Sequence, residues 1–165
     1  MKISVHILVG IMLITIESSL LSFFPVEFFK PDVGIPFIIY TTLFLGLRPG
    51  FIASLLIGLF QEVLSNSPNG SIIFTKVSIF LLATFLKRKL YIDSKYSFAY
   101  ICSVFVVVES FLYLILSILS KGETKDFMNI MFYIIPNAIF TGFISFFIFS
   151  LMGYLQQGVS AKNNL

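Results

Sequence analysis

The chain has 165 residues, of which 58% are hydrophobic and only 12% are charged. Its mean hydropathy of +1.00 is typical of a membrane protein and excludes a water-soluble domain with a charged surface. The net charge of +3 comes from basic residues scattered at the ends of apolar segments. They form no stripe interleaved with aromatic residues, so the sequence does not predict binding to nucleic acid.

Apolar segments account for most of the chain, and about 20 such residues suffice to cross a hydrocarbon layer of roughly 30 Å. In chain order they are residues 3–24, 33–47, 50–65, 71–86, 97–119 and 128–155. We therefore predict an all-α, polytopic membrane protein, a bundle of about six transmembrane helices. The bundle forms one domain, residues 1–155, and a short polar cytoplasmic tail follows, residues 156–165. Because the second to fourth segments are short, five spans with a re-entrant pair is the alternative.

Turn signals divide the central part of the chain. Pro31-Asp32 opens this part, Arg48-Pro49-Gly50 interrupts it, and a polar run at residues 65–70 closes it. Within the last apolar segment, Pro136 removes a backbone donor and predicts a kink.

The distribution of basic residues predicts the orientation of the bundle. Six spans place both termini on the same side of the membrane. That side carries the larger share of basic residues, which indicates that the termini are cytoplasmic. The residues on that side are Lys2, Arg48, Lys87, Arg88, Lys89, Lys95 and Lys162, against Lys30, Lys121 and Lys125 on the other.

Small residues recur along one face of the third segment. Gly50, Ser54, Gly58 and Glu62 are four residues apart and so lie along one side of a helix. Small side chains let another helix approach closely. We expect this face to pack inside the bundle or to contact a partner helix.

Four acidic or basic side chains fall within the predicted spans, namely Glu17, Glu62, Lys76 and Glu109, and His6 lies near the end of the first. Such groups are costly in a membrane and are candidates for function by default. Glu62 and Lys76 flank the same turn, so we predict an intramembrane ion pair between them. The pair would fix the register of the two helices, or the two residues would contact a partner or a ligand.

Glu17 and Glu109 have no evident basic partner in the sequence. We expect them to be hydrogen-bonded between helices, with a relay for protons or cations as the alternative. A second small polar stripe, Asn137, Thr141 and Ser145, predicts a seam between helices. No hydrolase, metalloprotease, kinase or dinucleotide-binding motif occurs, so we expect no enzymatic activity, no cofactor and no metal.

The central stretch resembles the rod shape-determining protein MreD family. The similarity lies in Pro31-Asp32 before an apolar run, in Arg48-Pro49-Gly50, and in the sequence GLFQEVLSNSPNG that follows. Family members commonly show a Gly, a few apolar residues, Gln and an acid, then a polar turn that ends in Gly. Gly58, Gln61, Glu62 and Gly70 match these positions, with Glu62 where the family usually has Asp.

This resemblance implies a non-enzymatic subunit of the bacterial cell-elongation machinery in the inner membrane. Its partners would be an MreC-like single-span protein and, directly or indirectly, an MreB-like actin homologue and the polymerase and transpeptidase of wall synthesis. The alternative is a small-molecule-binding subunit of a vitamin-uptake-type transporter. That protein would hold its ligand near Glu62, Asn66, Asn69 and Lys76. A third possibility is an ion or proton channel that uses Glu17 and Glu109.

Overall fold

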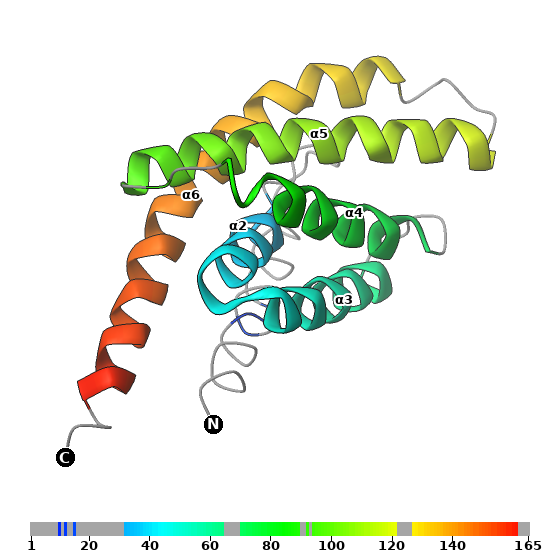
Figure 1. Ribbon diagram of the computed structural model, residues 1–165. Coiled ribbons are helices and arrows are strands. Elements are labelled where there is room, and N and C mark those ends of the chain that lie inside the picture. Colours follow the sequence, from blue (N-terminus) through cyan, green and yellow to red (C-terminus); the bar gives the residue numbers. More distant parts are fainter. Residues whose placement is uncertain are drawn as a thin grey trace.

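The computed structural model describes residues 10, 12, 15, 32–64, 70–89, 92, 94–121 and 127–161, and over these residues it contains helices and no strand. The all-α prediction is therefore confirmed for this part of the chain (Figure 1). The predicted first span, residues 3–24, lies outside the described residues except for Gly10, Met12 and Thr15, which are helical. The elements are α2 (Gly34–Tyr40), the π-helical η1 (Thr41–Leu45), α3 (Leu47–Val63), α4 (Ser71–Leu86), α5 (Lys95–Lys121) and α6 (Phe127–Ala161).

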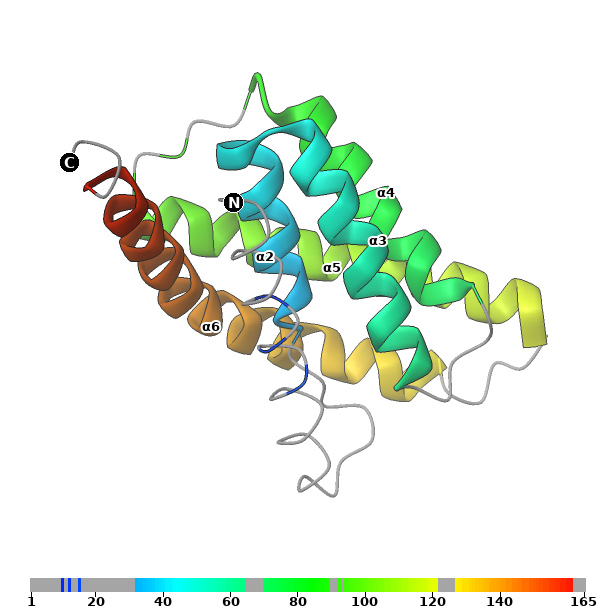
Figure 2. The same cartoon turned by 90° about the horizontal axis from the view of Figure 1, so that it is seen from below.

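Helix α2 lies at the centre of the bundle. All of its residues, Gly34–Tyr40, are buried, and it contacts each of α3, α4, α5 and α6. Figure 2 shows it between α6 and α3, with α5 behind. A helix surrounded on all sides needs apolar residues on every face, which explains the uninterrupted apolar sequence. Pro36 fits because it lies in the first turn, where backbone N–H groups have no partner within the helix.

The chain reverses direction at Gly46. The Thr41 hydroxyl donates to the Phe37 carbonyl at 2.9 Å, and the Thr42 hydroxyl donates to the Ile38 carbonyl at 2.7 Å. The Gly46 N–H then donates to the Thr41 carbonyl at 3.0 Å, and its φ of 114° is a conformation that glycine adopts without strain.

The turn predicted at Arg48-Pro49-Gly50 is therefore wrong. These three residues belong to the first turn of α3, which begins at Leu47. Proline and glycine are turn signals, but proline is equally compatible with the first turn of a helix, where no backbone donor is needed. The residue that allows the reversal is the glycine three positions before Pro49.

Two helix pairs surround α2. Helices α3 and α4 form a hairpin, and α5 packs along α6. The bounds of α4 agree with the predicted segment 71–86. Helices α5 and α6 extend beyond the predicted 97–119 and 128–155. Helix α6 continues to Ala161 through most of the predicted polar tail.

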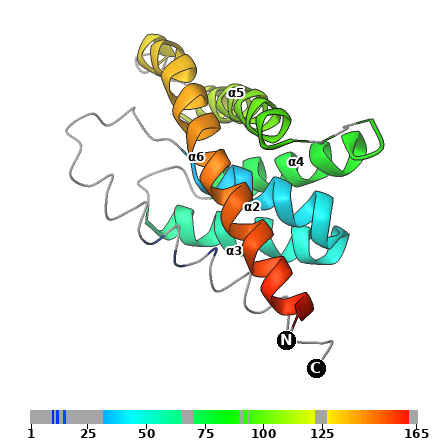
Figure 3. The ribbon, with the colours of Figure 1, turned by 90° about the vertical axis from the view of Figure 1, so that its left-hand side faces the viewer.

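Among the residues that the structure describes, two segments are long and apolar enough to cross a membrane. They are Lys95–Leu119, with 25 residues, and Met131–Tyr154, with 24 residues, compared with the ~20 residues that a span requires. The other apolar helical segments, Gly34–Leu45 and Ser71–Leu86, are shorter. Pro136 lies inside α6, and the helix is bent in Figure 1. It lies beside α5 at its beginning and passes α2 further along (Figure 3).

Candidate functional site

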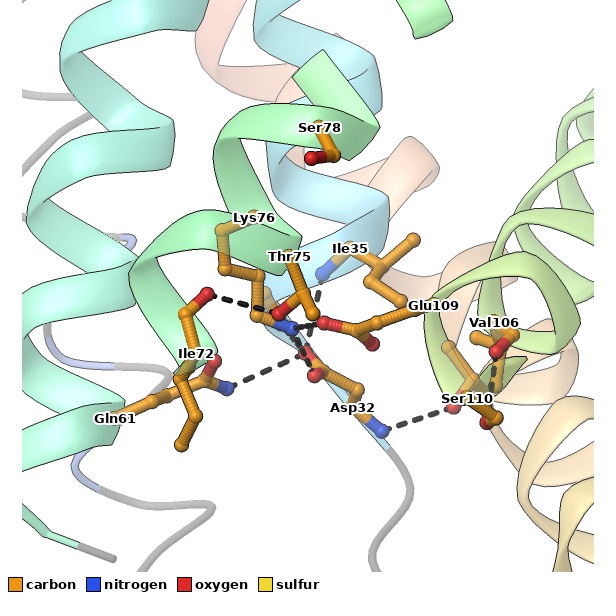
Figure 4. A network of polar contacts seen from close by, with 12 residues as sticks. Asp32, Ile35, Gln61, Ile72, Thr75, Lys76, Ser78, Val106, Glu109 and Ser110 are labelled. Carbon is orange, nitrogen blue, oxygen red and sulfur yellow. Dashed lines mark hydrogen bonds and ion pairs between the residues drawn. The ribbon is translucent and has the colours of Figure 1, made fainter. Parts of the chain in front are cut away.

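A buried lysine lies where the helices meet. Lys76 is in α4, and only 1% of its side chain is exposed. Its ammonium group contacts the carboxylates of both Asp32 and Glu109 (Figure 4). Asp32 lies two residues before α2 and Glu109 lies within α5. We call these three residues the Lys76 cluster.

Asp32 connects the Lys76 cluster to the remaining helices. Its Oδ1 accepts hydrogen bonds from the backbone N–H groups of Gly34 at 2.7 Å and Ile35 at 3.2 Å, and from Nε2 of Gln61 in α3 at 3.3 Å. Its own N–H donates to Oγ1 of Thr141 in α6 at 2.9 Å. Helices α2 to α6 therefore share one polar network.

Gly34 lets the beginning of α2 approach α3 closely. A Cβ atom at this position would lie 2.7 Å from Cγ2 of Ile57 and 3.0 Å from Oδ1 of Asp32. Any larger residue would therefore push α2 away from α3 and displace the Asp32 carboxylate. The glycine is required here for space, since it has the ordinary backbone conformation of a helix.

The charges of the Lys76 cluster are partly shielded from solvent. The Asp32 and Glu109 side chains are 18% and 14% exposed. A buried ion pair is stable only when its geometry is good and further hydrogen bonds satisfy its atoms. Asp32 meets this condition through three N–H donors in addition to Lys76. The arrangement can hold α2, α4 and α5 in register, since moving any one of these three helices would separate opposite charges in an apolar interior.

The predicted ion pair between Glu62 and Lys76 is wrong. Glu62, near the end of α3, accepts hydrogen bonds from the backbone N–H groups of Gly70 and Ile73, the latter at 3.2 Å. These groups begin α4 and have no acceptor within it. Lys76 lies about one turn further along α4, and its side chain extends into the bundle. Glu62 thus fixes the α3–α4 connection, and Gly70, with φ of 86°, precedes the helix.

Two acidic residues have roles that sequence reasoning missed. Glu109 was expected to have no basic partner, but Lys76 contacts it. The sequence indicates Asp32 only as part of a turn signal, but it belongs to the Lys76 cluster. Its position just before a helix with proline in the first turn is a capping signal. Glu17 lies outside the described residues.

The Gly50, Ser54 and Gly58 face packs inside the protein. All three residues are buried. A Cβ atom at Gly50 would lie 2.9 Å from Cα of Thr42, and one at Gly58 would lie 2.9 Å from Cα of Ile73. The face therefore contacts η1 and α4 closely. Of the two predicted roles, packing inside the bundle and contact with a partner helix, the structure shows the first.

The second small polar stripe also lies inside the bundle. Thr141 and Ser145 are fully buried, and Gly142 lies close to Ser103 of α5. The predicted seam between helices is confirmed for these positions.

The alternative ligand site near Glu62 and Lys76 does not form as expected, because the Lys76 side chain is directed to Asp32 and Glu109. Its other residues, Asn66 and Asn69, lie outside the described part of the chain. Among the residues that the structure describes, no group of three or more His, Cys, Asp or Glu side chains is placed to hold a metal ion.

A double-mutant cycle would test the corrected pairing. We expect the substitutions Lys76→Met and Glu109→Gln to be coupled by about 1–3 kcal/mol, because the two side chains are in direct contact. Lys76→Met and Glu62→Gln should be additive within about 0.5 kcal/mol. The measurement is thermal or denaturant unfolding of the four proteins of each cycle in detergent micelles. A larger coupling for Glu62 than for Glu109 would contradict the assignment.

Together, the fold and the site define a helical protein in which helices α2 to α6 meet at a buried charge cluster, and two segments of the described part of the chain are long enough to span a membrane. No protein-family model matches the chain, and no curated protein or solved structure is found to be similar to it.

Proposed function

We propose that this chain is an MreD-type protein, a non-enzymatic subunit of the bacterial cell-elongation machinery. It would reside in the inner membrane as a multi-pass bundle of about six spans with cytoplasmic termini. There it would bind an MreC-like single-span protein and help to position peptidoglycan synthesis, in direct or indirect contact with an MreB-like actin homologue and the wall polymerase and transpeptidase.

The observation that carries the proposal is that the residues of the resemblance belong to one structural unit. Gln61 donates to Asp32, and Glu62 accepts from the N–H of Gly70. Gly58 lies against the backbone of α4. A motif whose members depend on one another in this way is a determinant of the fold, so its presence supports a common architecture more strongly than a match of isolated residues would.

The outer surfaces of the long helices support a membrane location. One side of α6 exposes large apolar residues at intervals of three or four positions, and α5 also exposes several. Large apolar surfaces of this kind are unfavourable in water and are typical of contact with lipid or with partner helices. On α6 they are Phe132, Ile135, Ile139, Phe143 and Phe147.

Native mass spectrometry tests the proposal. The full chain would be extracted in mild detergent from the membranes of its own host, with and without depletion of the host's MreC-like protein. We expect a complex of the two proteins, and we expect cells depleted of this chain to lose their rod shape. If the chain travels alone, or with a stoichiometric small molecule, and its depletion leaves cell shape unchanged, the proposal is wrong.

A further inference from the structure

One end of the α3–α4 hairpin presents three basic side chains, Arg48, Arg88 and Lys89. We call them the basic patch. Arg48 is the second residue of α3, and Arg88 and Lys89 belong to the turn that follows α4. Because α3 and α4 form a hairpin, the beginning of one and the end of the other lie at the same end (Figure 2). All three side chains are exposed.

The neighbouring lysine is held by the protein instead. The ammonium group of Lys87 donates to the carbonyl oxygen of Thr42 in η1 at 3.0 Å. The N–H of Lys89 donates to the Leu86 carbonyl at 2.7 Å and closes the turn. The first bond holds the Lys87 side chain against η1 and the second closes the backbone turn, while the side chains of Arg88 and Lys89 are exposed. No Asp or Glu occurs at residues 33–61 or 63–92, so neither helix supplies an anion to the patch.

Large apolar side chains adjoin the basic patch. Phe85, about one turn before Arg88 and Lys89, is 76% exposed, and Leu47, next to Arg48, is 52% exposed. Phe51, one turn further along α3, is also exposed. Cationic groups at the end of the hairpin, with apolar surface beside them, are complementary to an anionic phospholipid. Such a lipid has a negatively charged head group next to apolar acyl chains. Arginine in particular binds phosphate oxygens with two parallel hydrogen bonds.

We propose that the basic patch binds the phosphate group of an anionic phospholipid, with the acyl chains against Phe85 and Leu47. The inference does not depend on the proposed function, because it concerns only how this end of the bundle meets a membrane. It also places the beginning of α3 and the end of α4 at a leaflet rich in anionic lipid.

Native mass spectrometry of the purified full chain in detergent, titrated with lipid, tests this site. The probes are phosphatidylglycerol, phosphatidylcholine with the same acyl chains, and inorganic phosphate. We expect one phosphatidylglycerol to bind in preference to phosphatidylcholine. Each neutralising substitution, Arg48→Gln, Arg88→Gln or Lys89→Gln, should weaken it roughly fivefold, since a basic residue near an anionic lipid contributes ~1 kcal/mol.

Two control variants separate charge from folding. The charge-preserving combination Arg48→Lys, Arg88→Lys and Lys89→Arg should bind more tightly than the combination of the three neutralising substitutions, because the charges remain although lysine lacks the parallel hydrogen bonds of arginine. Lys121→Gln, at the other end of α5 from Lys95, removes one charge elsewhere and should leave the affinity unchanged. Equal binding of phosphatidylcholine, displacement of the lipid by inorganic phosphate at similar concentration, or an equal loss in Lys121→Gln would each overturn the proposal.

Discussion

Lys76→Met is expected to destabilise the protein by about 3–5 kcal/mol, because it leaves two carboxylates in the interior without their cation. Methionine retains most of the length of the lysine side chain, so the change removes charge with little loss of packing. The three remaining interactions of Asp32 with N–H donors cannot compensate Glu109, which lies on another helix. The measurement is thermal unfolding in detergent. The transition is recorded by circular dichroism and, separately, by a probe of helix packing.

Two comparisons show whether the loss is caused by unpaired charge. Lys87→Met removes a lysine that donates one hydrogen bond to the Thr42 carbonyl, and it should cost only about 1 kcal/mol. The combination of Lys76→Met with Asp32→Asn and Glu109→Gln removes all three charges together. It should recover most of the stability, since replacing a whole buried ion cluster by neutral groups is often close to neutral. A triple variant as unstable as Lys76→Met alone would contradict this explanation.

The local features of the fold could be predicted from the sequence. The apolar run at residues 71–86 gives α4 with the observed bounds, because Gly70 and the Lys87-Arg88-Lys89 run are unambiguous signals at its two ends. The position of the chain reversal at Gly46 could be predicted less well. Gly46 and Pro49-Gly50 are both turn signals. Only the packing of Gly50 against Thr42 decides that Pro49 and Gly50 already belong to α3.

The Lys76 cluster could not be predicted because its members are far apart in the chain. Lys76 is 44 residues from Asp32 and 33 residues from Glu109. Glu62 was the nearest acid in sequence, and proximity across a turn favoured it. Which acid meets the lysine depends on how α2 and α5 are placed against α4, and hydropathy carries no information on that placement. The residues that follow Asp32 in the sequence indicate its capping role, but they do not indicate its ion pair.

Gly58→Leu should disrupt the α3–α4 hairpin and cost at least about 3 kcal/mol, with Gly58→Ala about 1–3 kcal/mol. Even the Cβ atom of alanine would lie 2.9 Å from Cα of Ile73. That neighbour is backbone, which cannot rotate away as a side chain can, so α4 itself must move. Because Lys76 lies on α4 less than one turn after Ile73, the movement should also weaken the contacts of the Lys76 cluster.

The matched control for this substitution is Gly153 in α6. A Cβ atom there would meet no atom of the described residues within 4 Å, so Gly153→Ala should be neutral or stabilising by about 0.5–1 kcal/mol through improved helix propensity. Unfolding in detergent compares the four single variants at Gly58 and Gly153, with leucine and alanine at each. If both positions tolerated leucine equally, the close approach of α3 and α4 would not be what holds the hairpin, and the ion cluster alone would have to fix the register of these two helices. A loss confined to Gly58 that grows from alanine to leucine shows instead that the close approach of α3 and α4 is required, because, of these two positions, only at Gly58 does an added side chain meet the backbone of a neighbouring helix.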